Sequence, residues 1–149
     1  MLNPMYLLLV AAIVVLASVR RIPEGHAYTL RRVGGHTRTV GSGMHIVLPI
    51  LERVAHRIRL LGNVVDIDAT AAQSGVRYSG QVYYQVLDAR RADAVIEHVD
   101  ELVRDCLLTL LGTEAGEDAA SSNARMKAAL NSRLGERGIL VTRVQVSAG

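Results

Sequence analysis

The sequence contains no tryptophan, no phenylalanine and a single cysteine among its 149 residues. One cysteine, Cys106, excludes an intramolecular disulfide framework and a cysteine-rich zinc site. Half of the residues are apolar and 21% are charged, which excludes a disordered or low-complexity chain. The length suffices for one domain with its own core.

Charged side chains are missing from the first 19 residues. Residues 20–60 then hold eight arginines against two glutamates, whereas residues 61–149 hold nine basic and twelve acidic residues. The formal net charge of +3 is too small to indicate nucleic-acid binding, and the basic segment lacks the interleaved aromatic residues that bind single strands. The basic excess therefore lies directly beside the uncharged N-terminal segment.

The N-terminal segment predicts a membrane anchor over residues 1–21. It is apolar from Met5 to Val19, and the uncharged run from Leu2 would form a helix of roughly 27 Å, close to the thickness of a bilayer core. A cleaved signal peptide is one alternative, although it would need a basic start and a small-residue cleavage site. A buried core helix is the other alternative. The positive-inside rule places the rest of the chain in the cytoplasm.

Residues suited to the membrane–water interface flank this segment. Tyr6 lies near its start, Arg20 and Arg21 close it, and Arg31 and Arg32 follow soon after. An amphipathic tyrosine ring and long basic side chains are typical of the headgroup region, and each arginine near the surface attracts anionic lipid. We therefore expect these five residues at the interface, in contact with anionic headgroups.

Residues 22–147 are expected to form one α+β domain. Two-residue periodicity predicts strands at 54–60, 76–86 and 139–147. Shorter strands are predicted at 27–33 and 63–69 and in the apolar run 44–48, with a turn at Gly34-Gly35. In the last strand, Leu140, Thr142, Val144 and Val146 are expected to share one face.

Two helices are expected between the last two strands. Helical periodicity predicts one helix of about six turns, capped by Asp88 and ended by Gly112. A loop at 113–122 precedes a second helix, with Ser121 or Ser122 as its N-cap and Gly138 at its C-terminal end. Its apolar stripe is expected to consist of Met126, Ala129, Leu130 and Leu134. This order of elements is typical of an α+β fold rather than a doubly wound sheet.

No pattern in the sequence indicates a catalytic, metal or cofactor site. The five histidines show no helical i, i+4 pair, and Cys106 is interpreted as a packing residue on the inward stripe of the first helix. Asp66 and Asp68 would share one face of a strand, which suits a cation site or an acid–base pair but more often marks a solvent face. Gly41-Ser42-Gly43 lacks the Lys and Ser/Thr of a phosphate-binding loop.

Five segments resemble, in order, motifs of the SPFH (band 7) family, which comprises stomatin, prohibitin, flotillin and bacterial relatives. Ile-Pro-Glu-Gly at 22–25 is similar to the family's membrane-exit motif, and residues 82–88 match one of its strands closely. The other three segments are residues 41–49, 64–67 and 138–146.

The resemblance implies a membrane-anchored scaffold without enzymatic activity. Such proteins form homo-oligomers or hetero-oligomers with longer paralogues, organise lipid microdomains and regulate membrane proteins such as proteases. Three features depart from the family's pattern. The arginine that the family has after the long helix is missing after Thr109-Leu110-Leu111, Arg137 stands where the family has a tryptophan, and no C-terminal coiled coil follows. The resemblance therefore implies a short member that caps, joins or regulates assemblies of longer paralogues.

One alternative comes from a different class of protein. A membrane-tethered hydrolase could assemble its site only in the folded chain, although the sequence lacks the G-x-S-x-G pattern of a serine hydrolase. A buried carboxylate near His45 or His56 would favour this interpretation.

Overall fold

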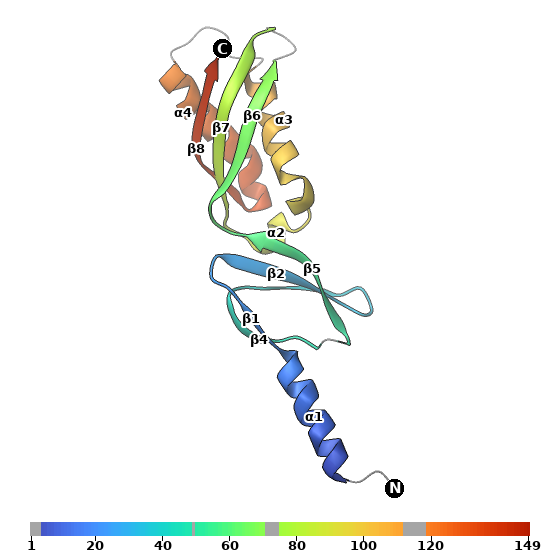
Figure 1. The fold of residues 1–149 in the computed structure, drawn as a ribbon. Helices are drawn as coiled ribbons and strands as arrows, with labels where there is room; N and C mark the ends of the chain where they lie inside the picture. Colours follow the sequence, from blue (N-terminus) through green and yellow to red (C-terminus); the bar gives the residue numbers. More distant parts are fainter. Residues whose placement is uncertain (1–3, 49, 71–74, 112–118) are drawn as a thin grey trace. The chain divides into compact units, whose positions relative to one another are not determined.

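A computed structural model describes residues 4–48, 50–70, 75–111 and 119–149 (Figure 1). The chain forms two compact units, Met1–Ile58 and Arg59–Gly149. Strand β1 pairs with β4, β2 with β3, β6 with β7 and β7 with β8, in each case antiparallel. The predicted α+β class is confirmed.

The first unit consists of one helix and two small sheets. Helix α1 (Pro4–Ser18) leads into β1 (Val19–Ile22), which pairs with β4 (Gly43–Ile46). Strands β2 (His26–Arg32), β3 (Thr37–Val40) and β5 (Glu52–Arg59) form the second sheet in the order β3-β2-β5. The small core contains Ile22, Leu30, Val40 and Val47, with Tyr28 packed against it.

The β2–β3 hairpin turns where the sequence predicts. Gly34 and Gly35 have φ angles of 111° and 88°, which side chains with a Cβ rarely adopt. The turn is closed by the Arg32 N–H, which donates to the His36 carbonyl over 2.8 Å.

Helix α1 is shorter than the segment from which it was predicted. It contains 15 residues, about 22 Å at 1.5 Å per residue, and Val19 already belongs to β1. Within the described ranges, no helix combines the length and the apolar character needed to cross a membrane.

The second unit packs two helices on one face of a three-stranded sheet (Figure 1). The sheet has the order β6-β7-β8, from β6 (Asn63–Thr70), β7 (Arg77–Val86) and β8 (Ile139–Ala148). Val65 and Ile67 of β6 are buried, whereas Asp66 and Asp68 between them are exposed. The predicted strands at 63–69 and 76–86 are therefore confirmed, with the polar face of the sheet open.

Helices α3 (Val99–Leu111) and α4 (Ala119–Leu134) form the second layer of this unit. The predicted stripe of α4 is largely confirmed, because Met126, Leu130 and Leu134 are buried. Tyr84 of β7 donates its hydroxyl to Asp100 of α3 over 2.9 Å, and burial raises the pKa of the Tyr84 phenol above its ordinary value. This hydrogen bond ties the sheet to α3.

The outer edge of β8 is closed by side chains of α4. The Asn131 amide donates to the Val141 carbonyl over 3.1 Å and accepts from the Val141 N–H over 2.7 Å. Asn123 accepts from the Val146 N–H in the same way. Because an open edge strand invites pairing with other chains, these contacts protect the unit against uncontrolled strand addition.

The prediction of one continuous helix from Asp88 to Leu110 is wrong. Asp88 does cap a helix, accepting from the N–H groups of Arg90 and Arg91, but this helix, α2 (Ala89–Ala92), is only four residues long. A turn and a 3₁₀ segment, η1 (Ile96–His98), separate it from α3. The physical reason is that α2 is fixed beside β8 by hydrogen bonds from the Leu87 and Asp88 N–H groups to the Gly138 carbonyl, whereas α3 packs on β6 and α4.

Two smaller predictions also need correction. Ser121 and Ser122 lie inside α4, which already includes Ala119 and Ala120, so neither caps it. Its apolar stripe ends at Leu134, and the 3₁₀ turn η2 (Gly135–Arg137) follows before Gly138 adopts the left-handed conformation. Gly112 and residues 113–118 lie outside the described residues.

The face predicted for the last strand holds for only half of β8. Val144 and Val146 are buried as expected, but nearer the start Ile139 and Val141 are buried in place of Leu140 and Thr142. The register between β7 and β8 shifts at Tyr83/Tyr84, which lie opposite Arg143 and Val141. The extra residue, Thr142, reverses the alternation of the strand.

Candidate membrane interface

Helix α1 is apolar around its whole circumference and exposed along its length. Every described side chain before Ser18 is exposed, with fractions of 73% for Leu8 and 75% for Leu16. Ser18 is buried and donates its hydroxyl to the Val14 carbonyl over 2.6 Å. A helix with no polar face is stable only where apolar material surrounds it, in a protein core or in lipid.

The apolar surface continues from α1 onto the adjoining sheet. The register places Val19 opposite Ile46 and Arg21 opposite Met44, so these four side chains share one face of the β1–β4 pair. The Val47 N–H donates to the Ser18 carbonyl over 2.7 Å and extends the pairing to the end of α1. Met44 and Ile46 are 77% and 69% exposed.

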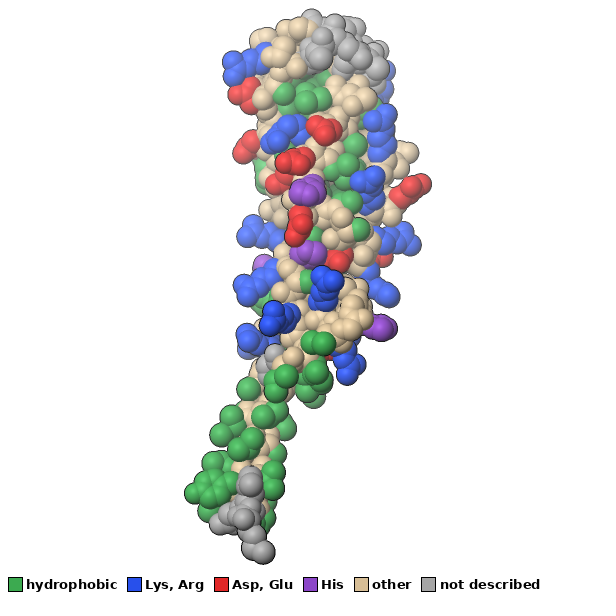
Figure 2. Space-filling view, turned by 90° about the vertical axis from the view of Figure 1, so that its right-hand side faces the viewer, with side chains coloured by type: hydrophobic (Ala, Val, Ile, Leu, Met, Phe, Trp, Pro, Cys, Tyr) green, Lys and Arg blue, Asp and Glu red, His purple; other side chains and the backbone are tan. Residues whose placement is uncertain are grey.

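The chain after β4 adds further apolar side chains. Leu48 and Ile50 are exposed, Ile50 by 82%. We call the set Val19, Met44, Ile46, Leu48 and Ile50 the apolar collar. Figure 2 shows hydrophobic side chains along α1 and beside its end, with Lys and Arg side chains gathered beyond them.

The five residues predicted at the interface are all exposed, but they lie on different elements. Tyr6 is 62% exposed on α1, and Arg20 and Arg21 lie on β1 directly after that helix. Arg31 and Arg32 lie at the end of β2, in the other sheet. The structure thus places Arg21 on the same face as part of the apolar collar.

Sequence reasoning missed Arg38, which links three strands next to the collar. Its Nη2 donates to the Ile46 carbonyl of β4 over 3.3 Å and to Oε2 of Glu52 on β5 over 3.2 Å. Arg38 was only one of eight arginines in the basic segment. No spacing along the chain could show that β3, β4 and β5 meet at this side chain.

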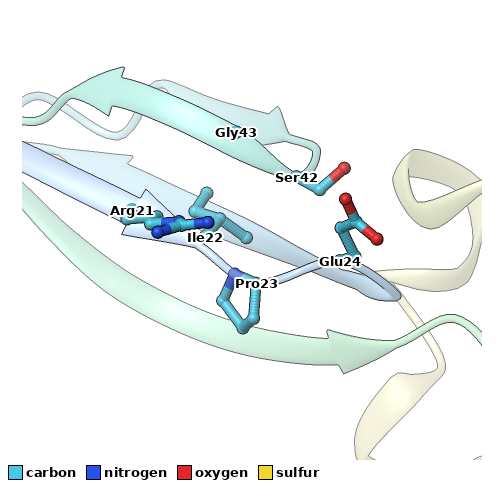
Figure 3. A pocket seen from close by; sticks show the side chains of 6 residues that line it. All are labelled: Arg21, Ile22, Pro23, Glu24, Ser42 and Gly43. Atoms are coloured by element: carbon cyan, nitrogen blue, oxygen red, sulfur yellow. The ribbon is translucent and has the colours of Figure 1, made fainter.

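A shallow pocket of about 440 Å³ opens between β1 and the turn before β4 (Figure 3). Arg21, Pro23, Glu24 and Ser42 contribute to its lining, together with Ile22 and Gly43. Among the described residues that line it there is no imidazole, and Nε2 of His45 lies 3.0 Å from the Gly41 carbonyl. The polar lining consists of a carboxylate from Glu24, a hydroxyl from Ser42 and the guanidinium of Arg21.

No family model matches the chain. It is 28% identical over 152 residues to an uncharacterised protein of Mycobacterium tuberculosis, covering 94% of this chain and 40% of that protein. It is 21% identical over 117 residues to human mitochondrial stomatin-like protein 2, covering 76% of this chain and 33% of that protein.

The chain is a distant homologue of stomatin-like protein 2, of the SPFH (band 7) family. A similar match, 23% identical over the same length, is found with an uncharacterised protein of Schizosaccharomyces pombe. The predicted resemblance is confirmed at this level of distant homology. The chain spans less than half the length of these curated relatives.

Asp66 and Asp68, which the sequence suggested as a cation site or an acid–base pair, are hydrogen-bonded within the sheet. Arg77 donates to both carboxylate oxygens of Asp68 over 2.9 and 2.8 Å, and this hydrogen-bonded pairing lowers the pKa of Asp68. Asp66 accepts from the Gln81 amide over 2.9 Å. Both carboxylates therefore support cross-strand pairing on an exposed face, the interpretation that the sequence favoured.

The remaining candidates for chemistry are Cys106 and the five histidines. Cys106 is a half-buried free thiol on α3. Across the described ranges, no three His, Cys, Asp or Glu side chains converge as a metal site, and every Asp and Glu is at least partly exposed. The buried carboxylate that the hydrolase interpretation needs near His45 or His56 is therefore not found in the described part of the chain.

Proposed function

We propose that this chain is a membrane-anchored scaffold of the stomatin type and has no enzymatic activity of its own. The observation that carries the proposal is the exposure of α1, an uncharged helix whose described side chains before Ser18 are all exposed. Distant homology to stomatin-like protein 2 supports the same class, because SPFH proteins are generally non-enzymatic.

In this proposal α1 is embedded in a bilayer and the apolar collar rests on the lipid surface. Transfer of the exposed leucines, valines and isoleucines of α1 from water into lipid is favourable by a free energy of roughly 1.5–3 kcal/mol for each side chain. Arg20 and Arg21 follow at the headgroups, and the positive-inside rule places them, with the sheets that follow, on the cytoplasmic side.

The scaffold function requires association with other proteins. We propose homo-oligomers or hetero-oligomers with longer paralogues, which organise lipid microdomains or regulate membrane proteins such as proteases. The distribution of charge supports contacts between copies, because Glu101 and Asp105 form an exposed acidic flank on α3 while the first unit is basic. Opposite potentials on two surfaces of one chain favour head-to-tail association.

Native mass spectrometry of the full chain, extracted from membranes in a mild detergent, tests this function. We expect multimers, and we expect the double substitution Glu101→Lys and Asp105→Lys to shift them toward monomer. Glu136→Lys, an exposed acidic position outside α3, is the matched control and should leave the multimers intact. A wild-type chain that is monomeric at every concentration, alone and with its membrane partners, would contradict the scaffold proposal.

A further inference from the structure

The β2–β3 hairpin forms a second pocket, of about 500 Å³, in the first unit. Its floor is the buried Leu30, and its walls include Arg32, Val33, His36, Arg38 and Glu52. The Val33 N–H donates to the Leu51 carbonyl over 2.8 Å, which holds the hairpin against the segment before β5. The pocket is therefore built by hydrogen-bonded backbone and not by loose side chains alone.

The charge of this pocket suits an anion. Arg38 pairs with Glu52 over 3.2 Å and so balances its carboxylate. Arg32 has no acidic partner in the part of the chain that the structure describes, which leaves one guanidinium charge for a ligand. A guanidinium with an imidazole and a threonine hydroxyl, from His36 and Thr37, offers several donors to the oxygens of a phosphate group.

The pocket lining includes one exposed apolar residue, Val33, which lies near the collar. Val33 is 74% exposed, and its hydrogen bond to Leu51 places it beside the segment that carries Ile50. Arg38 donates to the carbonyl of Ile46, itself a member of the collar. A phosphate in this pocket would thus be bound next to a surface that accepts acyl chains, an arrangement that suits a lipid better than a free anion.

We propose that this pocket binds the phosphate of an anionic phospholipid, with Arg32 as the principal ligand and the acyl chains lying toward the apolar collar. The inference rests on the proposed membrane association and adds selectivity to it. Contact of α1 with lipid does not depend on headgroup charge, whereas the pocket increases the affinity for lipids whose phosphate is accessible.

Flotation of the full chain with vesicles tests the pocket. The vesicles contain phosphatidylcholine alone or phosphatidylcholine with phosphatidic acid, at constant ionic strength. We expect phosphatidic acid to raise the affinity of the wild-type chain for the vesicles. We expect Arg32→Gln to lower the affinity for vesicles with phosphatidic acid about tenfold. Arg31→Gln is the matched control: it removes the same charge from the neighbouring residue of β2, which does not line the pocket, and should lower the affinity by about fivefold or less.

Three results would overturn the inference. Equal losses in the two variants would show diffuse attraction to the surface, and equal binding to both kinds of vesicle would show no selectivity. Saturable binding of inorganic phosphate to the detergent-solubilised chain, lost in Arg32→Gln without any change in flotation, would assign the pocket to free phosphate. Failure to bind phosphatidylcholine vesicles at all would instead contradict the anchoring by α1, so the two proposals fail separately.

Discussion

Replacing Leu9 and Ile13 together by arginine is expected to release the chain from membranes. Both side chains are more than half exposed on α1, so the change removes little packing within the protein. An arginine near the centre of a membrane helix costs about 2.5–3.5 kcal/mol, and the two together weaken partitioning by about four orders of magnitude.

Membrane fractionation with carbonate washing, followed by detection of the full chain, measures this effect. The matched control is Leu61→Arg with Leu87→Arg, which places two arginines at exposed leucines of the second unit. The control should remain in the membrane pellet with the wild-type chain. If the Leu9→Arg, Ile13→Arg variant also stays in the pellet after carbonate, α1 is not the anchor.

Gly80→Ala is expected to cause a large loss of stability in the second unit. Gly80 lies in the middle of β7, opposite Val146 of β8. A Cβ at this position would collide with the Gln145 carbonyl and would lie 2.7 Å from the Val146 Cα. Because these atoms belong to the backbone, the clash can be relieved only by separating the two strands, at a cost of about 3 kcal/mol or more.

Chemical denaturation of the detergent-solubilised chain, followed by circular dichroism, measures the loss. Gly135→Ala is the control, since nothing lies within 4 Å of its added Cβ and its φ is not positive. We expect this control to change the free energy of unfolding by less than about 1 kcal/mol. Equal midpoints for the Gly80→Ala and wild-type chains would show that β7 and β8 are not packed as closely as described.

The elements predicted best are those whose pattern is long and local. Strand β7 shows ten residues of alternation, and α4 shows three buried side chains at helical spacing, so both were found from sequence. The break between α2 and α3 could not be found, because Gly138, distant in sequence, fixes the first turn. The reversed alternation in β8 likewise depends on a register shift against β7.

The candidate interface was predictable only in its linear part. The uncharged segment and the arginines that follow it are visible in the sequence, but the apolar run at 44–48 predicted only a strand, and not that Met44 and Ile46 would be exposed beside the end of α1. The role of Arg38 and the pocket beside Arg32 depend on the meeting of β3, β4 and β5. Such contacts between strands distant in sequence leave no periodic signal.

Fluorescence of a single introduced tryptophan tests the insertion of α1 most directly, because the chain has no tryptophan of its own. Leu8→Trp and Leu61→Trp place the reporter on α1 and on the second unit, both at exposed positions. With phosphatidylcholine vesicles, we expect the emission of the Leu8→Trp chain to shift to shorter wavelength and to be quenched by lipids brominated on their acyl chains, while Leu61→Trp stays unquenched. An unshifted and unquenched Leu8→Trp reporter would contradict the membrane anchor.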